Sequence, residues 1–263
     1  MLIIENQKKR VLVPVLLILS LIFRLFLAAP VSRLIGMDLG DTDWARYLIY
    51  QAVWYLVPLS VVMLLLHRPK EILSELGLSH GFTRGLGSAI VLTLPMFAGY
   101  VFLGSSPDPG AAVTIVAASV FAGFFEELFF RGFIFGQLFR TARWGFVPAA
   151  MLSGLFFAAG HLYQSNDMAG AVAVFGITFI GSAWFSWLFV ESGWNLWFPV
   201  FLHAFMNLSW GLFSMDDTAA GGWAANIPRF VTIALSILYI LIFVRKERGL
   251  LIRTSDLWVH RKG

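Results

Sequence analysis

Long apolar segments separated by short polar connections dominate the pattern of the chain. We interpret eight of these segments as membrane-spanning helices, because roughly 20 apolar residues in helical form cross the hydrocarbon core of a bilayer. They lie approximately at 11–29, 44–66, 84–103, 111–139, 146–163, 170–190, 196–213 and 230–244. Residues 71–80 mix apolar and polar positions at helical spacing, which predicts a short helix lying at the membrane interface. The pattern therefore predicts an all-α, polytopic membrane helix bundle that forms a single membrane-embedded domain over residues 1–263.

Ionisable residues interrupt the fourth apolar segment. Glu126, Glu127 and Arg131 lie inside the run at 111–139. Charged groups at membrane depth are costly, so they normally face a bundle interior or a wet cavity and carry function. Glu127 and Arg131 have i,i+4 spacing with the acid first, which favours an ion pair on one helical face. Glu126 points to an adjacent face without an obvious partner, so we expect the chemistry of the protein to take place around Glu126.

Composition settles the class of protein. Of the 263 residues, 59% are hydrophobic and 13% are charged, whereas about a quarter of the residues are charged in soluble domains. The chain is therefore an integral membrane protein. It has no cysteine, which excludes a disulfide framework, a cysteine nucleophile and a cysteine-based metal site. The net charge is +4, but the basic residues cluster beside apolar segments, which indicates contacts with lipid headgroups and no nucleic-acid partner.

The charges of the connections predict the orientation in the membrane. One set of connections and the two ends are basic, with Lys8, Lys9, Arg10, Arg68, Lys70, Arg84, Arg140, Arg143, Arg245, Lys246, Arg248, Arg253, Arg261 and Lys262. The alternate connections are mostly acidic, with Asp38, Asp41, Asp43, Asp108, Asp167, Asp216 and Asp217. Basic connections stay in the cytoplasm, so both termini are expected there, with residues 245–263 as a basic cytoplasmic tail. A cleaved signal peptide is the less favoured reading of the first segment, because Arg24 interrupts it and Pro30 would follow the cut.

Three polar residues stand out in the later spans. His161 lies near the end of the fifth span, while His203 and Asn207 lie one helical turn apart in the seventh and therefore share a face. Together with Glu126 they are predicted to line one cavity at similar membrane depth, within a catalytic core of about residues 110–214. For each residue alone, a hydrogen bond that holds helices together is the competing interpretation.

This set of side chains suits hydrolysis by activated water. A glutamate in a partly desolvated pocket acts as a general base toward water. A neighbouring histidine shares that water, or Glu126, His161 and His203 are candidate ligands of a metal such as zinc, which would activate it instead. An asparagine and a second histidine donate hydrogen bonds to a developing oxyanion. The chain contains neither H-E-x-x-H nor G-x-S-x-G, and its aspartates lie in predicted connections or the tail, which disfavours a paired-aspartate mechanism.

The ordered set of motifs resembles a known family. The motifs are Glu126-Glu127-x-x-x-Arg131, Phe157-x-x-x-His161 and His203-x-x-x-Asn207. In order, spacing and placement on separate helices they are similar to those of the CPBP family, which comprises CAAX proteases and bacteriocin-processing enzymes and is also called the Abi family. The resemblance spans about residues 110–210. It implies an eight-helix bundle whose site lies in a cavity open to the cytosolic leaflet.

The resemblance also implies roles for the motif residues. It implies Glu126 as the water-activating base with His161 as its partner. It implies transition-state stabilisation by His203 and Asn207, and it implies that Glu127 and Arg131 hold the site in shape. Family members are described both as metalloproteases and as metal-independent glutamate proteases, so a zinc cofactor and no cofactor both stay open.

The expected function is a CAAX-type intramembrane endopeptidase that cleaves a membrane-associated or lipidated peptide or protein. The expected location is the bilayer of a prokaryotic cytoplasmic membrane, as a multi-pass protein. The alternative is a non-catalytic membrane protein, such as a bacteriocin-immunity factor or a scaffold. A proton or ion pathway with Glu126, His161 and His203 as a relay is less favoured, because few polar residues lie in the outer half of the predicted spans.

Overall fold

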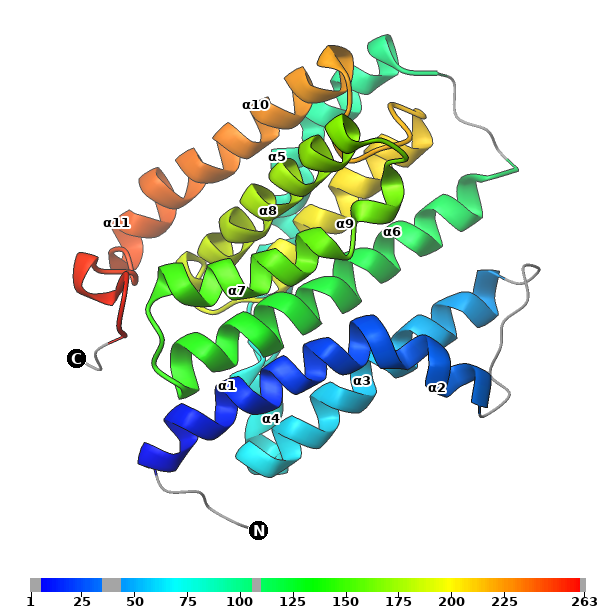
Figure 1. Ribbon diagram of the computed structural model, residues 1–263. Helices are drawn as coiled ribbons and strands as arrows, with labels where there is room; N and C mark the ends of the chain where they lie inside the picture. Colours follow the sequence, from blue (N-terminus) through cyan, green and yellow to red (C-terminus); the bar gives the residue numbers. More distant parts are fainter. Residues whose placement is uncertain (1–5, 35–43, 106–109, 261–263) are drawn as a thin grey trace.

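The computed structural model describes residues 6–34, 44–105 and 110–260 (Figure 1). Its α-helices are α1 (Asn6–Ile22), α2 (Ala28–Leu34), α3 (Trp44–Leu66), α4 (Pro69–Glu75), α5 (Phe82–Leu103), α6 (Ala112–Glu126), α7 (Phe146–Ala159), α8 (Met168–Glu191), α9 (Trp197–Leu212), α10 (Trp223–Tyr239) and α11 (Arg245–Arg248). Wider π-helical turns form η1 (Phe23–Leu27), η2 (Glu127–Phe135), η3 (Gln137–Thr141) and η5 (Ile240–Val244), and 3-10 turns form η4 (Leu162–Gln164) and η6 (Thr254–Asp256). Across these ranges the chain forms no β-strand, so the all-α prediction is confirmed.

Every predicted span coincides with a helix. Within the described ranges, six helical segments are long and apolar enough to cross a membrane. A seventh is added if Gln51–Leu66 of α3 and Pro69–Glu75 (α4), which meet at a bend of 116°, count as one span. Helix α9 has 16 residues and is shorter than these segments. The number of membrane crossings and the cytoplasmic location of the termini therefore stay predictions. Among the charges used to predict the orientation, Asp38, Asp41, Asp43, Asp108, Arg261 and Lys262 lie outside the described residues.

The last span begins earlier than predicted. Helix α10 starts at Trp223, directly after the extended Gly222, and Pro228 lies inside it. The sequence prediction placed the start of this span at about residue 230 and was wrong about this boundary. Proline in a membrane helix removes one backbone hydrogen bond, which its neighbours can compensate, so the helix continues. As a consequence Arg229 belongs to the body of the helix and is buried.

Helix α9 lies at the centre of the bundle, where it packs against α5 and α6 and also contacts α8. Its approach to α6 is close because Gly123 has no side chain. A Cβ placed on Gly123 would lie 2.7 Å from the Cβ of Ala204 on α9. This approach brings the glutamates at the end of α6 beside the polar residues of α9.

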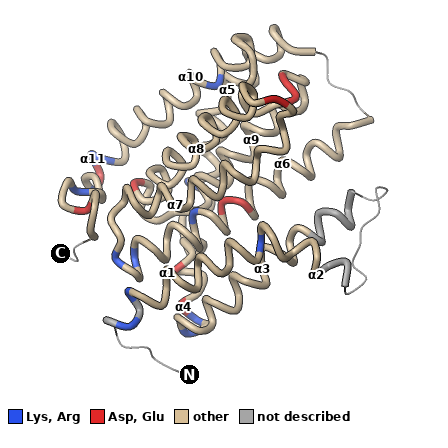
Figure 2. Tube along the Cα trace, viewed as in Figure 1, with Lys and Arg blue, Asp and Glu red and all other residues tan. Residues whose placement is uncertain are grey.

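The two chain termini lie at the same end of the bundle (Figure 1). The tail after α11 folds back onto this end, where the backbone of Gly145 donates to Trp258 and that of Val147 to Leu257. The carboxylate of Glu191, which is 1% exposed, accepts hydrogen bonds from the backbone of Leu251 and Ile252. Figure 2 shows basic residues gathered at this end, while the acidic residues between α9 and α10 lie at the opposite end.

Candidate active site

The two motif glutamates lie where the helix geometry changes. Glu126 is the last residue of α6 and Glu127 is the first of the π-helical stretch η2. Such widened turns inside helices occur frequently at functional sites. The two carboxylates have different surroundings, because the side chain of Glu127 is fully buried whereas that of Glu126 is 20% exposed.

Glu127 is the centre of a buried polar network. Its Oε1 forms an ion pair with Nη1 of Arg131 at 2.9 Å and lies 2.8 Å from Nδ1 of His203. The guanidinium of Arg131 also lies over the rings of Phe157, at 4.4 Å, and Phe185, at 5.2 Å. The predicted Glu127–Arg131 pair is therefore present, and the same carboxylate orients the imidazole of His203.

Glu126 pairs with His161 across a short gap. Nδ1 of His161 lies 2.7 Å from the carbonyl oxygen of Phe157, one turn earlier. A carbonyl only accepts hydrogen bonds, so this nitrogen carries a proton and the other, Nε2, is free to accept in the neutral ring. Nε2 lies 4.0 Å from Oε2 of Glu126, which is too far for a direct hydrogen bond. The gap suits a small ligand such as water between the two side chains.

The predicted site residues meet at one cavity. Glu126, His161, His203 and Asn207 all line a cavity of about 390 Å³ between α6, α7, α8, α9 and α10. The prediction that these four side chains share a cavity is confirmed, while their roles stay predictions. Glu127 and Arg131 do not line this cavity, but Glu127 contacts His203, which does.

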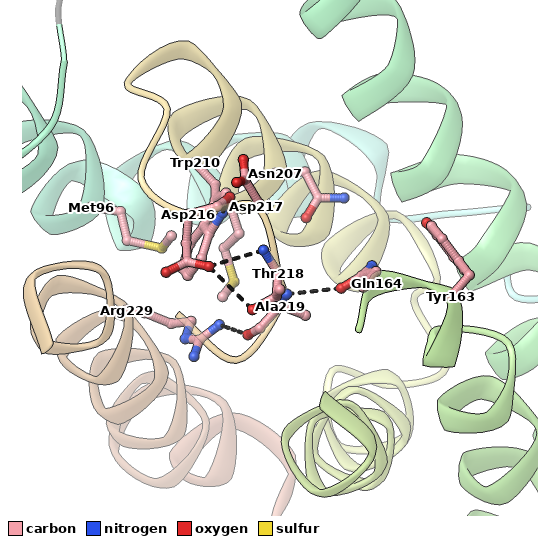
Figure 3. A pocket seen from close by; sticks show the side chains of 11 residues that line it. Met96, Tyr163, Gln164, Asn207, Trp210, Asp216, Asp217, Thr218, Ala219 and Arg229 are labelled. Carbon is pink, nitrogen blue, oxygen red and sulfur yellow. Dashed lines mark hydrogen bonds between the residues drawn. The ribbon is translucent and has the colours of Figure 1, made fainter. Parts of the chain in front are cut away.

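Two further cavities adjoin the first. Glu126 and His161 also line one of about 300 Å³ that reaches the α1 and α3 side of the bundle. Asn207 also lines one of about 310 Å³ beside the connection between α9 and α10 (Figure 3). Tyr163 lines all three cavities and is 80% exposed, so this side chain marks the place where the cavities meet the surface.

The comparison with known families covers the same helices. Residues 108–209 match the family model described as Type II CAAX prenyl endopeptidase Rce1-like. This segment is therefore similar to CAAX proteases, in agreement with the resemblance of its motifs. The match supports a CAAX-protease-like intramembrane endopeptidase in general terms. No curated protein and no solved structure matches the chain significantly.

The described residues do not bring a metal-binding set of side chains together. Catalytic zinc sites use three protein ligands around one point. Within the described ranges, no three His, Asp or Glu side chains come together in that way. Of the candidate ligands, His203 directs Nδ1 to Glu127, away from the Glu126–His161 pair. The residues therefore do not fit a zinc ion, and we derive no step through a metal.

Sequence reasoning missed Arg229, which also lines the cavity of about 390 Å³. Arg229 lies beyond the residues that the family model matches. The sequence interpretation treated it as a lone charge near a span end. The available signal was an arginine next to the apolar run that begins at Phe230, since charge at membrane depth usually marks function. Trp184 was missed as well, and its buried Nε1 has no acceptor among the described residues.

Proposed function

We propose that the protein is an intramembrane endopeptidase in which Glu126 and His161 jointly activate a water molecule. The observation that carries this proposal is the 4.0 Å gap between Oε2 of Glu126 and Nε2 of His161, in a cavity that His203 and Asn207 also line. A water about 2.8 Å from both atoms would donate one hydrogen to each, at an angle of about 90° between them. Its lone pair would then point away from both side chains toward a substrate.

The proposed reaction is hydrolysis of a peptide bond. The water oxygen attacks the carbonyl carbon while its proton passes to the carboxylate of Glu126. Nε2 of His203 and the side-chain amide of Asn207 stabilise the negative charge that develops on the carbonyl oxygen. Glu126 then transfers the proton to the leaving amine, the carbon–nitrogen bond breaks, and the products are a new carboxyl terminus and a new amino terminus.

The buried network behind the cavity supports this assignment. Nδ1 of His203 lies 2.8 Å from Oε1 of Glu127, and the proposed role of Nε2 as a donor requires a second proton on the same ring. Arg131 in turn fixes the carboxylate. These contacts give His203 one orientation, which pre-organised charge stabilisation requires.

The cavity walls favour an apolar, membrane-associated substrate. Besides the polar residues, the lining is largely apolar, with Ala122, Phe157, Ile177, Ile180, Phe185, Met206, Phe230 and Ile233. A peptide that enters would bury apolar side chains here while its backbone meets the polar residues. A lipidated or membrane-embedded peptide fits this environment better than a soluble, highly charged one.

The test is a cleavage assay with detergent-purified protein. The probe is a peptide ending in a farnesylated CAAX sequence, with a fluorophore and a quencher on the two sides of the bond after the cysteine. Replacing Glu126 by Gln should lower kcat/KM by about 10²–10⁴-fold, and Asn207→Ala by about 10²–10³-fold. Glu247→Gln, which removes an exposed ion pair with Arg84, is the matched control and should keep wild-type activity.

The thermal midpoint of each variant shows whether it is folded. A folded Glu126→Gln variant whose kcat/KM is within twofold of that of wild type would overturn the proposed role of Glu126 as the base. An absence of cleavage by wild type with this probe and with unprenylated membrane peptides would favour the non-catalytic alternative.

A further inference from the structure

Arg229 lies in α10 at the junction of two cavities. It lines the 390 Å³ cavity of the proposed site and the 310 Å³ cavity beside the α9–α10 connection. Its side chain is buried, with 9% relative exposure for the residue. Figure 3 shows its guanidinium beside Ala219, with Asn207 on the facing helix α9. The position is therefore inside the substrate chamber and not on the lipid-facing surface.

The hydrogen bonds of Arg229 leave part of its donor capacity unused. Nη1 donates to the carbonyl of Ala219 at 2.7 Å, and Nη2 donates to the carbonyl of Ala220 at 3.0 Å and to Oδ1 of Asn226. These bonds use three of the five N–H groups of an arginine. Nε is buried and has no acceptor among the described residues. The guanidinium therefore keeps N–H groups for a further acceptor.

The positive charge of Arg229 lacks a close carboxylate. Asp216 acts on it electrostatically, yet no ion pair within 4.0 Å joins Arg229 to an acid in the described part of the chain. Asp216 is exposed, and its Oδ1 already accepts from the backbone and hydroxyl of Thr218. The guanidinium also lies over the rings of Trp210, at 4.8 Å, and Phe230, at 5.9 Å, but none of these contacts supplies a full negative charge.

The charges in the cavity suggest what completes the site. Among its described lining residues, Glu126 is the only acid and Arg229 the only lysine or arginine. A peptide that presents its scissile carbonyl to the water at Glu126 would extend along the cavity toward Arg229. A carboxylate at that point would form a charge-assisted hydrogen bond with the guanidinium. A peptide that is cleaved near its C-terminal end carries such a carboxylate at that end.

We propose that Arg229 binds the C-terminal carboxylate of the substrate. This inference rests on the proposed endopeptidase function and deepens it, because it names the feature of the substrate that the site recognises. Arg229 acts here as a specificity-determining residue. A glutamate or aspartate side chain near the end of the peptide offers the same chemical group, so the experiment separates these two sources.

The experiment compares three probes that differ only at the C-terminal end. They are the farnesylated CAAX peptide as a free acid, the same peptide as a C-terminal amide, and an amide with glutamate as the last residue. Wild type should cleave the free acid with a kcat/KM at least about tenfold above the amide, mainly through KM, since a site built to bind one polar group rejects the analogue lacking it. The glutamate-containing amide should resemble the plain amide.

Substitution of Arg229 should remove this selectivity. Arg229→Gln should lower cleavage of the free acid to the level of the amide, so that the ratio of the two kcat/KM values falls to about one. Arg229→Lys should recover part of the preference, because it keeps the charge. Arg84→Gln, which changes an exposed arginine at the other end of the bundle, is the matched control and should behave as wild type. If Arg229→Gln fails to fold, the Arg229→Lys variant carries the comparison.

A binding measurement separates the two proposals. In the Glu126→Gln background, fluorescence anisotropy of the same labelled peptides should give a Kd at least about tenfold lower for the free acid than for the amide, and adding Arg229→Gln should abolish the difference. Equal binding and equal cleavage of acid and amide would overturn the carboxylate site while the protease stands. A binding preference without cleavage by wild type would overturn the protease and keep the carboxylate site. If Arg229→Gln lowers kcat/KM equally for the acid and the amide, the arginine only stabilises the connection between α9 and α10.

Discussion

The Glu127–Arg131 pair should be energetically inseparable, so the single and double replacements form a sharp test. Both side chains are 0% exposed and their closest atoms lie 2.9 Å apart. Removing one partner of a buried pair leaves an uncompensated charge and costs about 3–5 kcal/mol. Arg131→Met also loses the contacts of the guanidinium with Phe157 and Phe185, which are worth about 0.5–2 kcal/mol each. We therefore expect Arg131→Met to be the most destabilising of the set.

The double variant Glu127→Gln plus Arg131→Met should be more stable than the sum of the two single changes predicts. It contains no unpaired charge, and the glutamine oxygen still accepts from Nδ1 of His203. The coupling free energy should be about 0.5–3 kcal/mol. Activity should not follow stability, since the double variant lacks the negatively charged carboxylate beside Nδ1 of His203.

Thermal and denaturant unfolding in detergent, followed by tryptophan fluorescence, provides the assay. The ten tryptophans of the chain give the signal, and its lack of cysteine removes thiol oxidation as a complication. Glu247→Gln is the control, because its exposed pair with Arg84 should contribute at most about 1 kcal/mol. The coupling would be refuted if the change in the free energy of unfolding in the double variant equals the sum of the two single changes within about 0.5 kcal/mol.

Three further predictions concern other parts of the bundle. Gly123→Val should destabilise the protein by about 1–3 kcal/mol and reduce cleavage, because even a Cβ at Gly123 would lie 2.7 Å from that of Ala204. Unfolding and cleavage assays test this prediction, and a variant with unchanged stability and activity would contradict the close approach of α6 and α9. Glu126→Gln should leave stability within about 0.5 kcal/mol of wild type, since its side chain is partly exposed and makes no direct hydrogen bond; a large shift in the unfolding midpoint would show a structural role instead. Glu191→Ala should free the tail, seen as faster amide hydrogen exchange at Leu251 than in wild type; unchanged protection would mean that other contacts hold the tail.

Much of the fold followed from the sequence because ionisable residues are rare inside apolar spans. In such a background the position of each helix is visible, and Glu127 and Arg131 could be paired from their spacing alone. His161 and His203 were found for the same reason. The cavity they share could be predicted because helices of known direction place residues at comparable depth.

Features that depend on contacts between distant segments could not be predicted. The π-helical stretch that begins at Glu127 was not predicted from the sequence. The hydrogen bond between Glu127 and His203 joins residues 76 positions apart. Glu191 was unassigned because its partners, the backbone N–H groups of the tail, carry no side-chain signal. Pro228 misled the prediction because surrounding helices decide whether a proline ends a membrane helix.

The position of the cavities relative to the termini has a consequence for the timing of proteolysis. The cavities reach Gln164, Asp217 and Ala219, in connections at the end of the bundle opposite to both termini. If the cavities open at this end, the orientation predicted from charge places the opening outside the cytoplasm, whereas the family resemblance implies a cytosolic opening. With the charge-based orientation, a polypeptide must be exported before it is trimmed, and cleavage would report that translocation is complete. With the reverse orientation, trimming would precede export and would act on chains still held in the cell.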